Sequence, residues 1–344
     1  MALPRNLTRA EFCRGLTGIA ISALCGAANA DVQPLKLIIP AAKGGINDLA
    51  GQLVARHFGR FLPGSPHAYA VNDERGGVAL VNRFAQQGGG DAIEIAILQR
   101  AVAQLAIQGD STTHFDPLKR TWLGSLSSFA NDAYVLIVAS RHPAKTVWDL
   151  APPAPPALIG GDAPGSTNLT FALIGRDALK LNIEVKNGFA GAAGMFFAMM
   201  DGDLDGQVIG LNSLMANQPQ LWKSRDVRPL LQFGRRSRHP LLPDVPLASE
   251  YTHDRDALAL VAFTEAPLAM ALPFVAPAGL APQRAMMLQR AFSEMVRNRD
   301  FLADAKKVNL DITPVSGAAV RSIIAAMAAT PKDLIARYNA ITNG

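Results

Sequence analysis

Two loops in this sequence have residue types that can bind a small anion. The first covers residues 40–48 and the second residues 160–168, and each joins an apolar strand to an amphipathic helix through glycines and small polar residues. At such a junction the first backbone N–H groups of the helix are unpaired, and the positive end of the helix dipole faces the loop. Because the two loops lie about 120 residues apart, we expect two lobes that each offer a helix N-terminus to one shared anion.

The sequence gives less support to catalysis. It contains no G-x-S-x-G elbow, no G-x-x-x-x-G-K-[ST] loop and no H-E-x-x-H motif. Ser166 remains a candidate nucleophile, because a Ser/His/Asp triad assembles in space and requires no fixed spacing. A serine at a helix start more often caps the helix or hydrogen-bonds a ligand, and we expect one of these roles for Ser166.

The segment 201–206 resembles the start of a calcium-binding loop. It has acids at positions 1, 3 and 5 and a glycine at position 6, but position 12 is Asn212 in place of the bidentate glutamate. A turn between a helix and a strand explains the same residues, because glycine and aspartate tolerate turn conformations. We therefore expect a turn here and no metal site.

The first 30 residues have the features of an export signal. Arg5, Arg9 and Arg14 precede an apolar stretch too short to span a bilayer, and an Ala-Asn-Ala cleavage site follows at residues 28–30. Cleavage after Ala30 removes both cysteines, which excludes disulfides and thiolate metal sites from the mature chain. It also removes three arginines and one glutamate, so the formal net charge falls from +5 to +3. With 6% aromatic residues, this charge does not favour nucleic-acid binding.

The mature chain alternates between predicted strands and helices, a pattern typical of parallel sheets flanked by helices. Hydrophobic residues make up 49% of the full sequence and can supply a large core. We predict strands at residues 35–39, 68–71, 93–98, 121–126, 134–139, 157–160, 183–185, 207–211, 227–233 and 274–276. We predict helices at residues 46–61, 78–86, 168–180, 192–200, 282–306, 317–328 and 331–341.

Seven short motifs, in order along the mature chain, resemble those of one family. They are Pro40-x-x-x-Gly44-Gly45-x-x-Asp48, Phe115–Pro117, Gly165–Asn168, Gly188–Gly191, Gly202–Asp205, Pro240–Pro246 and Ala276–Pro282. The set is similar to that of the Bug-type solute-binding proteins, which are the periplasmic receptors of tripartite tricarboxylate transporters. The resemblance implies an α/β protein with the two-lobed type II periplasmic-binding fold, each lobe a mostly parallel sheet flanked by helices. Residues 31–138 and 262–344 would form the first lobe and residues 139–261 the second, with crossings near residues 134–140 and 258–274.

The resemblance also implies a ligand site between the lobes, where two loops hold a carboxylate. Asp48 would hold a water molecule or cap its helix, because it would repel a carboxylate. The expected ligand-binding residues are Lys43, Gly44, Gly45, Asn47, Asp48, Gln99, Arg100, Ser166, Thr167, Asn168, Phe189, Ala190, Gly191, Asp205 and Asn212.

The sequence departs from the family where the ligand would lie. Phe189-Ala190-Gly191 replaces the common Tyr-Lys-Gly, and residues 72–77 depart from the usual Asn-x-Pro-Gly-Ala-Gly-Gly. Lys43 and Arg100 offer positive charge for a second ligand anion, whereas the phenylalanine equally suits an apolar or aromatic group.

The resulting hypothesis is a monomeric periplasmic receptor, with no cofactor, that binds a small organic carboxylate and delivers it to the membrane subunits of a tripartite tricarboxylate transporter. The alternatives are an orphan receptor for a membrane sensor and a secreted serine hydrolase.

Overall fold

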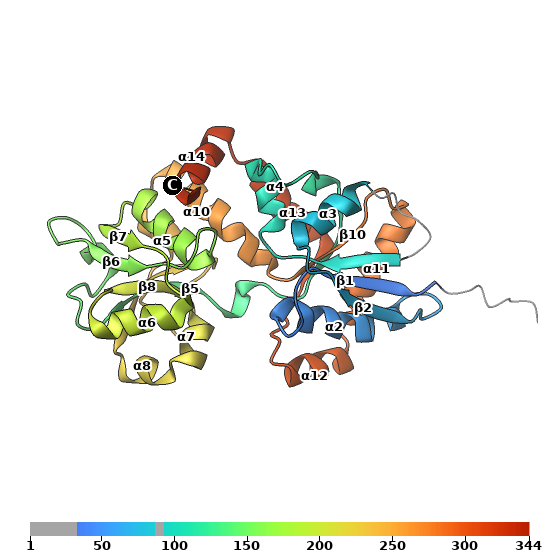
Figure 1. Ribbon diagram of the computed structural model, residues 1–344, viewed down its shortest axis with the longest axis horizontal. Helices are drawn as coiled ribbons and strands as arrows, with labels where there is room; N and C mark the ends of the chain where they lie inside the picture. The colour runs from blue at the N-terminus through green and yellow to red at the C-terminus, as the bar shows by residue number, and fades with distance from the viewer. Residues whose placement is uncertain (1–32, 87–92, 344) are drawn as a thin grey trace, which may run out of the picture.

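The computed structural model describes residues 33–86 and 93–343, which form two lobes side by side along the long axis of the molecule (Figure 1). The proposed export signal and its cleavage site lie outside these residues. Within them, every helix is too short or too polar to cross a membrane.

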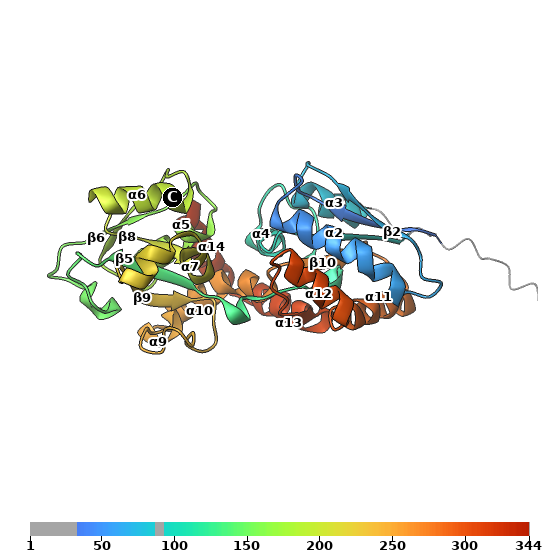
Figure 2. The same cartoon turned by 90° about the horizontal axis from the view of Figure 1, so that it is seen from below.

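The first lobe is built around a six-stranded sheet with the order β11-β4-β10-β3-β1-β2. Apolar residues alternate along its strands, so that Leu35, Leu37 and Ile39 pack on one face and Ile38 packs on the other. The helices α2, α11 and α12 cover the first face, and α3, α4 and α13 cover the second (Figures 1 and 2). The elements are β1 (Leu35–Ile39), α2 (Ile46–Phe58), β2 (Ala68–Asn72), α3 (Gly77–Gln86), β3 (Ile93–Ile97), α4 (Val102–Gln108), β4 (Thr121–Ser125), β10 (Pro273–Ala276), α11 (Pro282–Met295), α12 (Arg299–Lys307), β11 (Val315–Ser316) and α13 (Gly317–Ala328).

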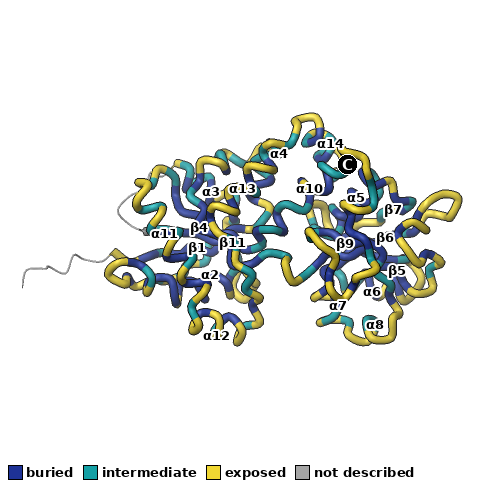
Figure 3. Tube along the Cα trace, turned by 180° about the vertical axis from the view of Figure 1, so that it is seen from behind, coloured by how far each residue is buried: buried dark blue, intermediate teal, exposed yellow. Residues whose placement is uncertain are grey.

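The second lobe contains a five-stranded sheet with the order β7-β6-β8-β5-β9. Most residues of its inner strands are buried, whereas the edge strand β7 and the outer faces of its helices are largely exposed (Figure 3). The elements are β5 (Tyr134–Ala139), β6 (Ala157–Gly160), α5 (Thr167–Asp177), β7 (Ile183–Lys186), α6 (Gly191–Asp201), β8 (Gly206–Gly210), α7 (Leu211–Asn217), α8 (Pro219–Ser224), β9 (Val227–Phe233), α9 (Ala248–Tyr251), α10 (Arg255–Glu265) and α14 (Lys332–Asn343).

Both sheets are mixed, with a parallel part extended by antiparallel strands. β1 pairs in parallel with β2 and β3, and β6 pairs in parallel with β7 and β8. β10 runs antiparallel to β3 and β4, and β5 runs antiparallel to β8 and β9. Both β5 and β10 enter their sheets directly from the other lobe, so no crossover helix turns them to run with their neighbours. The alternation of strands and helices in the sequence did not indicate this reversal.

The lobes meet at two short 3-10 helices, Phe129–Asn131 and Ala266–Met270. The first of these helices comes just before β5, and all of β5 pairs within the second sheet. The chain therefore enters the second lobe before residue 134, and the predicted boundary after residue 138 is wrong. The second of these helices lies inside the crossing predicted at residues 258–274. A continuous apolar cluster passes through this region, from Trp122 in the first lobe through Leu268 to Phe171 in the second.

The C-terminal helix corrects a second boundary. α14 was assigned to the first lobe, but it packs against α5 and α10 of the second (Figure 1). The ring of Tyr338 meets that of Phe263 edge-on, with centroids 4.9 Å apart. The apolar stripe of α14 therefore places the C-terminal end of the chain on the second lobe, although α11, α12 and α13 before it belong to the first.

The long helix predicted at residues 282–306 is two helices. α11 ends at Met295, and α12 begins after Asn298, whose side chain accepts hydrogen bonds from the backbone N–H groups of Asp300 and Phe301. An asparagine that caps the backbone in this way competes with helix continuation. The break follows from this cap.

Candidate functional site

The loop between β1 and α2 is closed by its own aspartate. Gly44 has a positive φ of 91°, which favours glycine, and its N–H donates to Asp48 Oδ2 at 2.8 Å. Asn72, the last residue of β2, donates from Nδ2 to Asp48 Oδ1 at 2.9 Å and to the carbonyl oxygen of Ala41 at 3.0 Å. Asp48 thus ties the loop to the neighbouring strand while α2 begins at Ile46.

These bonds keep Asp48 ionised. Burial raises the pKa of Asp48, but hydrogen bonds from Gly44, Asn72 and Gln52 and the charge of Lys43 more than offset this effect, so the pKa lies below its ordinary value. The residue is only 7% exposed. Asp48 therefore stabilises the loop itself. The other predicted residues of this loop are more accessible: Lys43, Gly44 and Gly45 are exposed, and Asn47 is half-buried at the start of α2.

The loop between β6 and α5 is organised by Asn168. Ser166 occupies the N-cap position of α5, but its hydroxyl donates to Asn168 Oδ1 at 2.7 Å and makes no capping bond. Asn168 Nδ2 donates to Asp162 Oδ2 at 2.9 Å. Ser166 makes no cap, and the N–H of Leu169 donates to Asn168 Oδ1 at 2.6 Å, so the N–H groups of Thr167 and Asn168 are the ones that an anion could meet.

Two further loops lie at the same edge of the second sheet. The N–H of Phe189 donates to the carbonyl oxygen of Gly161, which joins residues 189–191 to the β6–α5 loop. Lys186 Nζ lies 5.9 Å from the centroid of the Phe189 ring. Asn212 follows β8, and its N–H donates to Asp132 Oδ1 at 3.0 Å. These residues share an edge because β6 and β8 are parallel and both end there.

Arg100 links the two lobes at this edge. It follows β3 in the first lobe, and its Nη2 donates to Thr167 Oγ1, at the start of α5 in the second lobe, at 2.8 Å. The guanidinium also lies 5.6 Å from the centroid of the Phe129 ring and 3.5 Å from the Tyr134 hydroxyl. The preceding residue, Gln99, donates to the carbonyl oxygen of Pro40 at 3.3 Å and so joins the first loop.

Asp205 is the predicted site residue that lies elsewhere. Its carboxylate accepts a hydrogen bond from the N–H of Leu158, and it precedes β8 at the amino end of the parallel strands. It is thus separated from the loops by the length of the strand, about 17 Å for five residues. The motif match did not reveal which end of the strand Asp205 would occupy, and its assignment to the site is wrong.

Three residues near the loops were not expected. Asn72 stands in the segment that departs from the family motif, and its amide is what fixes Asp48. The rings of Phe129 and Tyr134 stack beside Arg100 with centroids 5.4 Å apart. The position of Asn72 at the end of a strand next to β1 could have indicated its role. The sequence around Phe129 and Tyr134 has no motif that would have indicated theirs.

The acidic segment at residues 201–206 is a turn, as expected. α6 ends at Asp201, Gly202 follows in the left-handed conformation, and β8 begins at Gly206. We expect calcium and EDTA to leave the melting temperature of the protein unchanged. A rise of several degrees with calcium in a thermal-shift assay would contradict this interpretation, because an ion that binds only the folded state stabilises it.

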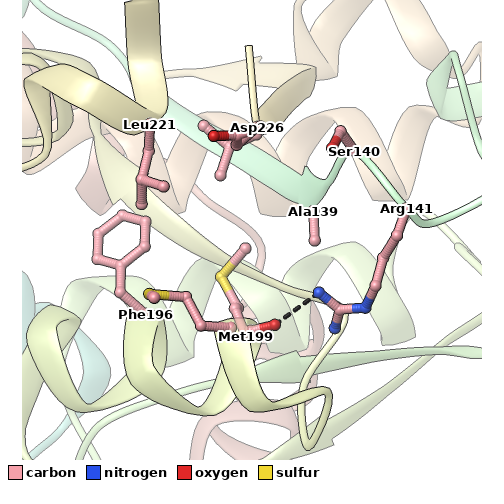
Figure 4. Close-up of a pocket in the computed structure, with 9 residues that line it drawn as sticks. Ala139, Ser140, Arg141, Phe196, Met199, Leu221 and Asp226 are labelled. Atoms are coloured by element: carbon pink, nitrogen blue, oxygen red, sulfur yellow. Dashed lines mark hydrogen bonds between the residues drawn. The ribbon is translucent and has the colours of Figure 1, made fainter. Parts of the chain in front are cut away.

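A cavity of about 300 Å³ lies away from these loops (Figure 4). Its walls include Phe196, Met199 and Leu221, and Arg141 donates at one side to the carbonyl oxygens of Met199 and Leu204. Ala139, the last residue of the antiparallel strand β5, places the cavity at the amino end of β8. It is therefore at the opposite edge of the sheet from Arg100 and the loops.

Comparisons with family models and with curated protein sequences found no match. Solved structures do resemble the chain. A TctC solute-binding protein from Polaromonas has 19% identity and a TM-score of 0.67, over 89% of this chain and 98% of that one. The periplasmic binding protein BugD has 15% identity and a TM-score of 0.53, over 89% and 98%. MatC from Rhodopseudomonas palustris, solved with malate, has 16% identity and a TM-score of 0.51, over 90% and 99%. The chain therefore has the two-lobed fold of the periplasmic solute-binding proteins.

Proposed function

We propose that this chain is a periplasmic receptor that binds a small organic carboxylate and delivers it to the membrane subunits of a tripartite tricarboxylate transporter. The observation that carries the proposal is the Arg100–Thr167 hydrogen bond, which joins the start of α5 in the second lobe to the segment after β3 in the first, where Gln99 is bonded to Pro40 at the start of the other loop. The malate bound to MatC, which has a similar fold, supports a carboxylate as ligand. The basic and apolar leader before residue 31 supports export to the periplasm.

Binding would use backbone groups more than side-chain charge. The N–H groups at the starts of α2 and α5 face an anion with the positive ends of two helix dipoles. Asp48 and Asn168 hold the two loops in shape by the hydrogen bonds described above. The loops are thus organised before a ligand arrives, which lowers the entropy cost of binding.

The hydrolase alternative finds no support at Ser166. Its hydroxyl donates to the amide oxygen of Asn168, a group that is not a general base at neutral pH. A receptor that reports to a membrane sensor would use the same two loops. Genes for transporter membrane subunits beside the gene for this chain would favour delivery over sensing.

A thermal-shift screen of mono-, di- and tricarboxylates, including aromatic ones, tests the proposal. We expect at least one compound to raise the melting temperature. We expect the Ser166 hydroxyl to turn from Asn168 to the bound carboxylate. Ser166→Ala is then expected to weaken binding of that compound by about 10- to 100-fold, the loss of one hydrogen bond to a charged group. Ser322→Ala on the exposed surface of α13, where the hydroxyl donates to the carbonyl oxygen of Ala318, is the matched control.

Two outcomes would contradict this prediction. The proposed function is wrong if none of the carboxylates stabilises the protein. The role of Ser166 is wrong if titration calorimetry gives the same affinity for Ser166→Ala as for the unchanged protein.

A further inference from the structure

Arg100 is a cation whose described partners are neutral. Its guanidinium donates to the hydroxyls of Thr167 and Tyr134 and lies over the ring of Phe129. Among residues 33–86 and 93–343, it has no carboxylate partner. Hydrogen bonds from arginine to a carboxylate are about twice as strong as those to a neutral acceptor. A ligand carboxylate at this place would therefore be a better partner than Thr167.

Other charges also lie near the two loops. Lys43 helps to lower the pKa of Asp48, and Lys186 lies over the ring of Phe189. The carboxylate of Asp162 accepts from the neutral side chain of Asn168. Arg100 differs from these groups because it is the cation that reaches the start of α5, whose positive dipole end adds to its attraction for an anion.

Aromatic rings lie beside the guanidinium of Arg100. Phe129 and Tyr134 are half-buried, and their stacked rings continue to Phe171, whose centroid is 5.4 Å from that of Tyr134. In the neighbouring loop, Phe189 and Ala190 carry no hydroxyl or charge. The described side chains that contact Arg100 thus offer two aromatic rings and two hydroxyls but no second cation, which suits a ligand with one carboxylate and an apolar ring or alkyl chain.

We propose that Arg100 binds the carboxylate of the ligand directly, in place of Thr167, and that the ligand is a monocarboxylate whose apolar body packs on Phe129 and Tyr134. This inference rests on the proposed function and goes beyond it, since it names the anchoring residue and the ligand class. The ligand then bridges the lobes through the same guanidinium that Thr167 now engages. Arginine suits this role because its planar donors match a carboxylate and its face stacks on an aromatic ring.

Titration calorimetry with benzoate, phenylacetate, hexanoate, succinate, malate and citrate tests the proposal. We expect one of the three monocarboxylates to bind most tightly, and the corresponding neutral amide to bind at least about 10-fold more weakly. Arg100→Gln, which retains a donor for Thr167, is expected to weaken the monocarboxylate by about 10- to 100-fold without a change in melting temperature beyond a few degrees. Arg290→Gln, which removes an exposed ion pair with Glu294 on α11, is expected to bind as the unchanged protein does.

The outcomes separate the two proposals. Failure of all six compounds to bind the unchanged protein would overturn the proposed function, and this inference with it. Preferred binding of succinate, malate or citrate would overturn the ligand class while the proposed function stands. Equal affinity of Arg100→Gln and the unchanged protein for the bound compound would overturn the anchoring role alone. Loss of affinity in Arg100→Gln together with a preference for a monocarboxylate would support the inference.

Discussion

Replacement of Glu265 by glutamine is expected to stabilise the protein at pH 8 by up to about 3 kcal/mol, and to have little effect near pH 4. Glu265 is the last residue of α10, where the chain leaves the second lobe. Burial raises the pKa of this carboxyl from 4.5 to about 7, against the opposing effect of a hydrogen bond from the N–H of Gly234. A glutamine keeps an oxygen that can accept this bond and removes the buried charge.

The direction of the pH dependence follows from the raised pKa. Below about pH 4.5 the carboxyl is protonated in both the folded and the unfolded chain, so its ionisation does not lower the free energy of unfolding. Between pH 4.5 and 7 the unfolded chain ionises while the folded chain keeps its proton, so stability falls as the pH rises. Above pH 7 the folded protein carries the buried charge and the full penalty remains.

Urea unfolding at pH 5 and pH 8 measures this difference. The comparison of Glu265→Gln with the unchanged protein cancels other titrations, including that of His239, whose pKa is lowered by burial and by Arg235. Glu294→Gln makes the same chemical change at an exposed ion pair with Arg290 and is expected to stay within about 0.5 kcal/mol at both pH values. A stabilisation by Glu265→Gln no greater at pH 8 than at pH 5 would show that the buried charge is not the cause.

Replacement of Phe274 by alanine is expected to destabilise the protein by about 3–5 kcal/mol, which is a large share of the stability of a typical domain. Phe274 is 0% exposed in β10, the strand that enters the first sheet from the second lobe. Its ring centroid lies 5.4 Å from that of Phe292 on α11. The substitution removes buried apolar surface and leaves a cavity between the sheet and the helix that covers it.

Urea unfolding followed by tryptophan fluorescence measures this loss, because Trp122 is buried in the first lobe while Trp148 and Trp222 report on the second. Phe197→Ala is the matched control, because the side chain of Phe197 is 69% exposed on α6 and should change the stability by no more than about 0.5 kcal/mol. A similar loss in the two variants would mean that burial in β10 does not determine the effect.

The sequence by itself determined most of the individual elements. A short run of mostly apolar residues predicted β1, and helical periodicity with a glycine junction predicted α2 after it. The turn at residues 201–206 was also predictable, because the wrong residue at position 12 and the following strand pattern exclude a calcium loop. These features depend on residues close in sequence, whose conformational preferences and spacing act locally.

Only the tertiary structure decided which residues meet. Arg100 and Thr167 are 67 positions apart and lie in different lobes, yet they share a hydrogen bond. Asp205 matches a motif but lies at the wrong end of its strand, because the direction of β8 is set by its pairing with β6 and β5. The place of α14 on the second lobe depends on which apolar faces remain uncovered after both sheets have formed. Hydrophobic burial has no direction of its own, so the periodic pattern that predicts an element does not specify its partner in the folded chain.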